Sequence, residues 1–216
     1  MKDLRAARRA THSFLHRLME VPETDLHTLL ASRLAPDVRY RVAHPIGDLV
    51  GVEAVLEGLV LPLRRALPRA MRRDEIFMAG TTRRGEGDFV TSLGHYVGNF
   101  ERPFSRVTPN GKLVFLRAGE MYRIEGETIV EATILLDLLD LKRQAGEFPL
   151  PHMLGTEMLF PGPATHDGVM PDAPERSEAS AALVEAMLTD LRAFDPQTFE
   201  STGQTGYWHP QMLWYG

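Results

Sequence analysis

The chain has 216 residues, of which 44% are hydrophobic and 25% are charged, and its formal net charge is −5. This is the composition of a globular protein with a buried core, and it argues against general disorder. The acidic balance gives no support to a nucleic-acid partner, which would favour a basic excess. The sequence has no cysteine, which excludes disulfides, thiolate nucleophiles and cysteine-ligated metals.

The first fifty residues predict two helices and a strand. Residues 5–19 carry apolar side chains at helical spacing, with arginines between them. Thr24 or Asp25 can cap a second, short helix. Apolar and basic residues then alternate over residues 38–42, a pattern typical of a strand. No apolar run is long enough to span a bilayer and no signal-peptide core is present, so we expect a cytoplasmic protein without a membrane partner.

The middle of the chain changes from a helical to a strand pattern. One apolar stripe runs along residues 52–67, and Pro62 inside it predicts a kinked helix. Turn signals then separate four expected strands, at residues 75–79, 89–100, 112–124 and 128–138.

This order of elements predicts an α+β fold over residues 1–146. Helices come first and strands joined by hairpin-type turns follow, which predicts a curved antiparallel sheet with the helices packed on one face. Such a sheet leaves a blind pocket at its open end.

The last third of the chain has a different character. Six of the 15 prolines fall in residues 147–176, which predicts a Pro-rich arm or linker. Residues 177–216 predict an amphipathic helix and an aromatic tail. The spacing of His209-Pro210 from Gly216 repeats that of His44-Pro45 from Gly51. This repeated spacing has two explanations, chance and the beginning of an incomplete second repeat.

Three segments together resemble the SnoaL-like polyketide cyclases. They are the helix approach at residues 44–51, the turn Thr-Pro-Asn-Gly-Lys at residues 108–112, and the acidic strand with a following Gln-Ala-Gly at residues 129–146. The resemblance covers about residues 10–146. It implies the cone fold shared with ketosteroid isomerase and nuclear-transport-factor-2-like proteins, a homodimer, and a reaction without metal or cofactor.

In that family an acidic residue acts as general acid and base in an intramolecular aldol closure, and the matching position is Asp137. The resemblance therefore implies a catalytic carboxylate at the end of the last strand, where proton transfer near neutral pH would be possible. The alternative is structural, since Asp137 could instead cap the helical turn that follows it.

The resemblance also bears on His95 and Tyr96. The family often has Gly-x-His-x-Gly on this strand, whereas this chain has Gly94-His95-Tyr96-Val97-Gly98. Tyr96 takes the place of the family's histidine and is predicted to donate a hydrogen bond to a substrate carbonyl. His95 faces the other side of the strand unless a bulge shifts the pleat, and is otherwise a hydrogen-bonded structural histidine.

Four more residues are candidates for substrate binding. They are His44, Tyr40, Glu120 and Tyr122. Glu120 shares a strand face with apolar residues, and a carboxylate on such a face must either line a cavity or form an ion pair. His44 could line the pocket rim or anchor its loop.

Other patterns predict no chemistry. His12 and His16 are spaced as i and i+4, but the sequence shows no acidic third ligand beside them, so we expect a solvated helix face and no metal site. The arginines between residues 64 and 73 are interpreted as a solvated edge.

Two functions remain open from the sequence. The first is a cofactor-free cyclase, isomerase or dehydratase. In it, Asp137 moves a proton next to a carbonyl, and Tyr96 or His95 stabilises the enolate oxygen by donating a hydrogen bond. The second is a non-catalytic module that holds a small apolar ligand in the same cone.

Overall fold

The computed structural model describes residues 3–83, 85–147, 162, 168–170, 174–193, 195–197 and 206–209. They belong to two units. The first comprises residues 1–162 and 168–170, and the second comprises residues 163–167 and 171–216. The predicted Pro-rich arm and the aromatic tail lie largely outside the described residues.

The first unit combines one six-stranded sheet with helices from both halves of the unit. The helices are α1 (Arg5–Glu20), α2 (Leu26–Ala31), α3 (Val52–Val55), α4 (Leu61–Ala66) and α5 (Leu138–Ala145). The strands are β1 (Leu34–Val42), β2 (Gly47–Val50), β3 (Met71–Thr81), β4 (Asp88–Asn99), β5 (Leu113–Glu125) and β6 (Thr128–Leu136). The predicted α+β fold is confirmed.

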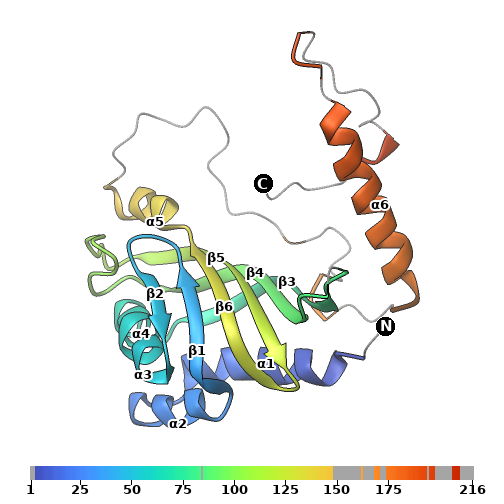
Figure 1. Ribbon diagram of the computed structural model, residues 1–216. Coiled ribbons are helices and arrows are strands. Elements are labelled where there is room, and N and C mark those ends of the chain that lie inside the picture. Colours follow the sequence, from blue (N-terminus) through green and yellow to red (C-terminus); the bar gives the residue numbers. More distant parts are fainter. Residues whose placement is uncertain are drawn as a thin grey trace. The chain divides into compact units, whose positions relative to one another are not determined.

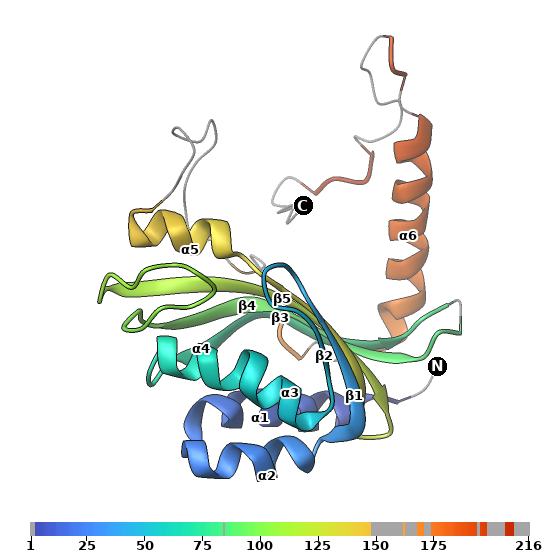
Figure 2. The same cartoon turned by 60° about the vertical axis from the view of Figure 1, so that its left-hand side comes forward.

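The sheet is curved and its strands follow the order β2-β1-β6-β5-β4-β3. Helices α1, α3 and α4 lie along its inner face, and α5 lies on the opposite side (Figures 1 and 2). Inner-face residues of the long strands are buried at alternate positions, so the core fills the space between sheet and helices. This is the arrangement of a cone with its helices inside.

One strand pairing differs from the antiparallel sheet that we expected. β1 and β6 run parallel, with Tyr40 opposite Ala132 and Val42 opposite Ile134, while the other neighbouring strands are antiparallel. A parallel pair requires a long crossover, and here the crossover contains α3, α4 and the four strands β2 to β5. The pairing brings Tyr40 to the inner face of the sheet.

The helix predicted over residues 52–67 is interrupted rather than simply kinked. Its middle, Leu56–Val60, forms a π-helical turn, and Pro62 lies in the first turn of α4. Proline is tolerated there because the first amides of a helix lack an intrahelical acceptor. A π-helical turn also bends the axis, so the segment follows the curve of the sheet.

The second unit is described mainly by helix α6 (Ser177–Asp190). Its apolar residues remain largely exposed, for example Leu183 at 55% and Val184 at 49%. The Tyr207 hydroxyl donates a hydrogen bond of 2.6 Å to Asp190. Among the described residues, no helix is long and apolar enough to cross a membrane.

Candidate functional site

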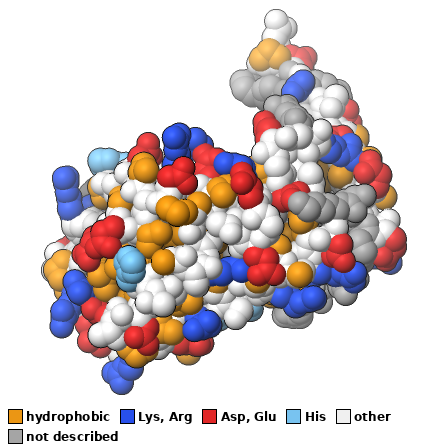
Figure 3. All heavy atoms as spheres, turned by 60° about the horizontal axis from the view of Figure 1, so that its bottom comes forward, with side chains coloured by type: hydrophobic (Ala, Val, Ile, Leu, Met, Phe, Trp, Pro, Cys, Tyr) orange, Lys and Arg blue, Asp and Glu red, His pale blue; other side chains and the backbone are white. Residues whose placement is uncertain are grey.

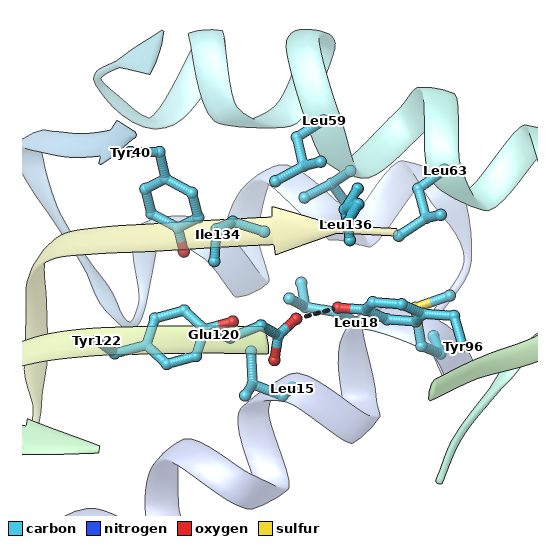
Figure 4. Close-up of a pocket in the computed structure, with 12 residues that line it drawn as sticks. Leu15, Leu18, Tyr40, Leu59, Leu63, Tyr96, Glu120, Tyr122, Ile134 and Leu136 are labelled. Atoms are coloured by element: carbon cyan, nitrogen blue, oxygen red, sulfur yellow. Dashed lines mark hydrogen bonds between the residues drawn. The ribbon is translucent and has the colours of Figure 1, made fainter. Parts of the chain in front are cut away.

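A small cavity lies inside the cone, between α1, the α3–α4 segment and the sheet (Figure 4). Its volume is about 30 Å³, which is room for a water molecule or two. Most of its wall is aliphatic. The polar part consists of one carboxylate and three phenols, from Glu120, Tyr96, Tyr122 and Tyr40. Four of the predicted site residues therefore meet in one cavity.

The Glu120 carboxylate is fully engaged by hydrogen bonds. Arg72 holds it with two guanidinium nitrogens, at 3.1 Å to Oε1 and 2.7 Å to Oε2. The Tyr96 hydroxyl donates a further hydrogen bond of 2.6 Å to Oε1. Since the Glu120 side chain is 1% exposed, these contacts balance a charge that would be costly if unpaired.

Arg72 is the centre of this buried network. Its guanidinium also donates to the Tyr96 hydroxyl at 2.7 Å, to Asp74 at 3.0 Å and to Ser92 at 2.9 Å. Burial alone would lower the pKa of Arg72, but the charges of Glu120 and its neighbours raise it well above its ordinary value. Arg72 therefore stays positively charged between two carboxylates.

Sequence reasoning missed Arg72. Its position precedes the strand predicted at residue 75, and it belongs to the arginine cluster interpreted as a solvated edge. β3 in fact begins at Met71, and the register places Arg72 opposite Tyr96. The one available signal was Glu120 itself, because a carboxylate on an apolar strand face requires a cationic partner from another strand.

The three tyrosines are hydrogen-bond donors at neutral pH. Burial is the main cause that raises the pKa of Tyr40, Tyr96 and Tyr122 above the ordinary value, and the negative charge of Glu120 adds to it. The hydroxyl groups of Tyr40 and Tyr122 point into the cavity (Figure 4). They are the donors that a ligand could reach.

Asp137 requires a correction, because it lies outside this cavity. Its Oδ1 accepts a hydrogen bond of 2.9 Å from the Asp140 amide and caps α5, while Oδ2 lies 2.7 Å from an Arg117 nitrogen. From Ala132 to Leu136, β6 alternates between buried and exposed residues, and the face with Ile134 and Leu136 is the one that lines the cavity. The structure therefore supports the alternative, a helix cap.

His95 also lies outside the cavity, on the outer face of the sheet. It is 6% exposed and packs edge-on against Phe115, with ring centroids 6.3 Å apart. β4 keeps a regular register with β5 across Gly94 and Gly98, and the register shift opposite Gly94 lies on β3, between Asp74 and Ile76, so no bulge in β4 turns the imidazole inward. The structure favours a structural histidine, but the expected hydrogen bond is not found at Nδ1, which is buried without a partner among the described residues.

His44 does not reach the pocket rim either. It is exposed in the turn between β1 and β2. The sequence pattern had placed it at a corner between a strand and a helix, because the short edge strand β2 was not predicted. Its predicted role at the rim is corrected accordingly.

The buried His95 predicts a specific dependence of stability on pH. Burial, then the charges of Arg117 and Arg73, lower the pKa of His95 from 6.5 to about 4. The unfolded chain thus takes up this proton at higher pH than the folded chain. The stability that the neutral ring contributes is complete above pH 6.5 and is lost as the pH falls toward about 4.

The comparison with His95→Gln isolates this contribution from that of the other histidines. Between those pH values, we expect the unmodified protein to lose up to about 1.4 kcal/mol of unfolding free energy per pH unit more than the variant. Urea denaturation at several pH values measures the difference. Parallel curves for the two proteins would show that His95 titrates normally.

The comparisons with known proteins agree with this fold. TsrD from Streptomyces laurentii superimposes with a TM-score of 0.51 at 16% identity, covering 65% of this chain and 97% of that one. IdmH from Streptomyces antibioticus superimposes with a TM-score of 0.51 at 19% identity, covering 64% of this chain and 98% of that one. AclR from Streptomyces galilaeus superimposes with a TM-score of 0.50 at 19% identity, covering 67% of this chain and 98% of that one. None of the curated proteins matches the sequence.

These structural similarities show the fold alone, and the family is shown by the sequence. The family model described as SnoaL-like polyketide cyclase matches residues 13–145, which span α1 to α5 and include every residue of the buried network. The chain belongs to the SnoaL-like polyketide cyclase family.

Proposed function

We propose that the protein is an enzyme that moves a proton next to the carbonyl group of a small molecule held in the cone. Membership in the family supports a small-molecule role of the cyclase or isomerase type. The observation that carries the finer proposal is the convergence of Glu120 with the hydroxyls of Tyr40 and Tyr122 on one cavity. With Asp137 outside the cavity, Glu120 is the carboxylate that lines it.

Removing a proton beside a carbonyl requires a base and a hydrogen-bond donor, because the negative charge develops on the oxygen. Glu120 would accept the proton as the C–H bond breaks and its electron pair forms the enolate. Tyr122 or Tyr40 would donate to the enolate oxygen. Arg72 orients the carboxylate and places a positive charge close to the developing negative one.

The volume of the cavity limits how a substrate can bind. Pockets for small organic ligands usually have about 300–1,000 Å³, whereas this cavity has about 30 Å³. Binding therefore requires that aliphatic wall residues move, among them Leu59 and Leu63 of the inner helical segment.

A second candidate function is non-catalytic binding of a small ligand. It is favoured by the contacts of Glu120, since both carboxylate oxygens already accept hydrogen bonds from Arg72 and Tyr96. A carboxylate held in this way can serve as a rigid part of the wall instead of a base.

Deuterium exchange distinguishes the two functions without knowledge of the natural product. Small 1,3-dicarbonyl compounds would be incubated with the protein in D₂O, and loss of the proton signal next to the carbonyl would be followed by NMR. We expect exchange faster than in buffer. Saturable binding without faster exchange would favour the binding module, and neither effect across the compounds would contradict both functions.

Removal of a cavity hydroxyl tests the donor role. No hydrogen bond from the Tyr40 or Tyr122 hydroxyl to another described residue is found, so Tyr40→Phe and Tyr122→Phe should fold normally. Loss of one donor to a developing oxyanion costs about 10²–10³-fold in rate, and we expect this from at least one variant. Tyr207→Phe, whose hydroxyl contacts Asp190 in the second unit, is the control. Unchanged exchange in both cavity variants would contradict the donor role.

We also propose that the protein forms a homodimer through the outer face of its sheet. Large apolar side chains are exposed there, including Met71 at 65%, Met121 at 44% and Leu135 at 62%, and the family resemblance implies a second copy of the chain as the partner. Leu135→Glu should then convert a dimer to a monomer in size-exclusion chromatography with light scattering. A monomeric unmodified protein would contradict the proposal.

A further inference from the structure

Two histidines of α1 and a carboxylate of β3 form a cluster beside the buried network. His12 and His16 lie one helical turn apart, and Asp74 comes from the strand that packs against this helix. One potential ligand atom from each residue lies within 4.8 Å of the others. The acidic third ligand that the sequence did not reveal is thus supplied by the fold.

The distances suit a metal ion. The Nε2 atoms of His12 and His16 lie 3.3 Å and 2.8 Å from Asp74 Oδ2. A tetrahedral ion bound at about 2.0–2.1 Å separates its ligand atoms by about 3.3 Å. Small side-chain rotations would therefore open the cluster enough to hold an ion.

The surroundings hold the three side chains in place. The other oxygen of Asp74, Oδ1, accepts hydrogen bonds from Arg72 at 3.0 Å and from Ser92 at 3.3 Å. The His12 ring packs edge-on against Phe77 at 4.8 Å. A metal ligand that is hydrogen-bonded from behind is oriented before the ion arrives.

The cluster is open to solvent on one side. The side chains of His12 and His16 are 28% and 33% exposed, whereas Asp74 is 3% exposed behind them. An ion can therefore approach from water between the two imidazoles. On the α1 and α2 side of the molecule, acidic and basic side chains are interspersed (Figure 3), so no block of one charge dominates that face.

The charges around the cluster are compatible with a cation. Asp74 contributes the carboxylate, and its Oδ1 lies 3.0 Å from Arg72. The positive charge of Arg72 opposes a cation, yet Glu120 binds both of its terminal nitrogens and offsets that charge.

We propose that His12, His16 and Asp74 bind a divalent first-row transition metal ion such as Zn²⁺. Two imidazoles and one carboxylate are ligands that such ions accept, and three protein ligands leave a coordination position for water or a further ligand. The three residues do not line the cone cavity, so the proposal is independent of the proposed function. Asp74 and Arg72 nevertheless connect the metal ligands to Glu120 through direct contacts.

Titration with Zn²⁺ tests the site, after a chelator has removed any bound metal from the protein. Calorimetry should show one ion bound per chain. Loss of a group that orients a metal ligand typically costs about 10–100-fold in metal affinity. His12→Ala and His16→Ala each remove a ligand itself, so we expect each to weaken Zn²⁺ binding by at least this factor. Both residues are partly exposed on a helix, where alanine is well tolerated, and circular dichroism confirms that the variants fold.

His27→Ala provides the matched control, because His27 is an exposed histidine whose nearest carboxylate is Glu53 at 3.6 Å. The affinity of the His27→Ala variant for Zn²⁺ should equal that of the unmodified protein. With Co²⁺ as a second probe, the visible absorption of an ordered low-symmetry site should disappear in His16→Ala. Zn²⁺ affinity that is the same in the unmodified protein and in a His12→Ala/His16→Ala double variant would overturn the proposal.

Discussion

Replacing Arg72 by methionine is expected to lower the free energy of unfolding by about 3–5 kcal/mol, the usual cost of removing one partner from a buried ion pair. The Arg72→Met substitution would leave the carboxylates of Glu120 and Asp74 without their common cation. Because these side chains are only 1% and 3% exposed, water cannot replace the lost partner. The hydroxyls of Tyr96 and Ser92 would each lose a donor as well. Urea denaturation measures the change.

Two further variants identify the cause of this loss. Arg65→Gln removes an exposed arginine whose guanidinium lies 3.0 Å from Glu23, and we expect no resolvable change because solvent screens that pair. The double variant Arg72→Met/Glu120→Gln should recover part of the loss, since it removes one of the stranded charges. If Arg72→Met were as stable as Arg65→Gln, the network would not be buried as described.

The buried network shows where sequence reasoning reached its limit. Tyr96 and Glu120 were predicted as pocket residues, and the structure joins them by a hydrogen bond of 2.6 Å. Local patterns were sufficient because each lies on an alternating strand with apolar neighbours. Their shared partner, Arg72, precedes the predicted start of its strand, and its burial depends on the register between β3 and β4. Register across a sheet is a long-range property that one strand does not encode.

Asp137 shows a different limit. The resemblance implied a catalytic carboxylate at the end of the last strand, but β6 does not turn that position toward the cavity. The apolar face with Ile134 and Leu136 turns toward the core, as burial of apolar area requires. Asp137 itself follows the last residue of the strand and begins α5. Because β6 ends at Leu136, the side chain of Asp137 does not continue the alternation of the strand.

The cluster of His12, His16 and Asp74 could not have been predicted for a similar reason. The i, i+4 histidine pair is visible in the sequence, but its third member is 58 residues beyond His16 along the chain. It reaches the pair only because α1 packs against β3. The aliphatic residues of α1, which the helical spacing did predict, determine that packing.

The largest functional effect is expected from the carboxylate in the cavity. Glu120→Gln keeps the shape of the side chain and removes the base, and loss of one acid–base catalyst typically costs on the order of 10²–10⁴-fold in rate. Asp137→Asn removes the carboxylate that caps α5 outside the cavity. Thermal unfolding of both variants identifies any loss of activity that follows from unfolding.

The most direct test of this account compares the two carboxylates in one assay. The rate of carbonyl-adjacent deuterium exchange would be measured by NMR for the unmodified protein, Glu120→Gln and Asp137→Asn at a temperature where all three are folded. We predict that Glu120→Gln loses the catalysed exchange and that Asp137→Asn retains it. Full exchange in Glu120→Gln, together with its loss in Asp137→Asn, would contradict the assignment of the site to the cavity.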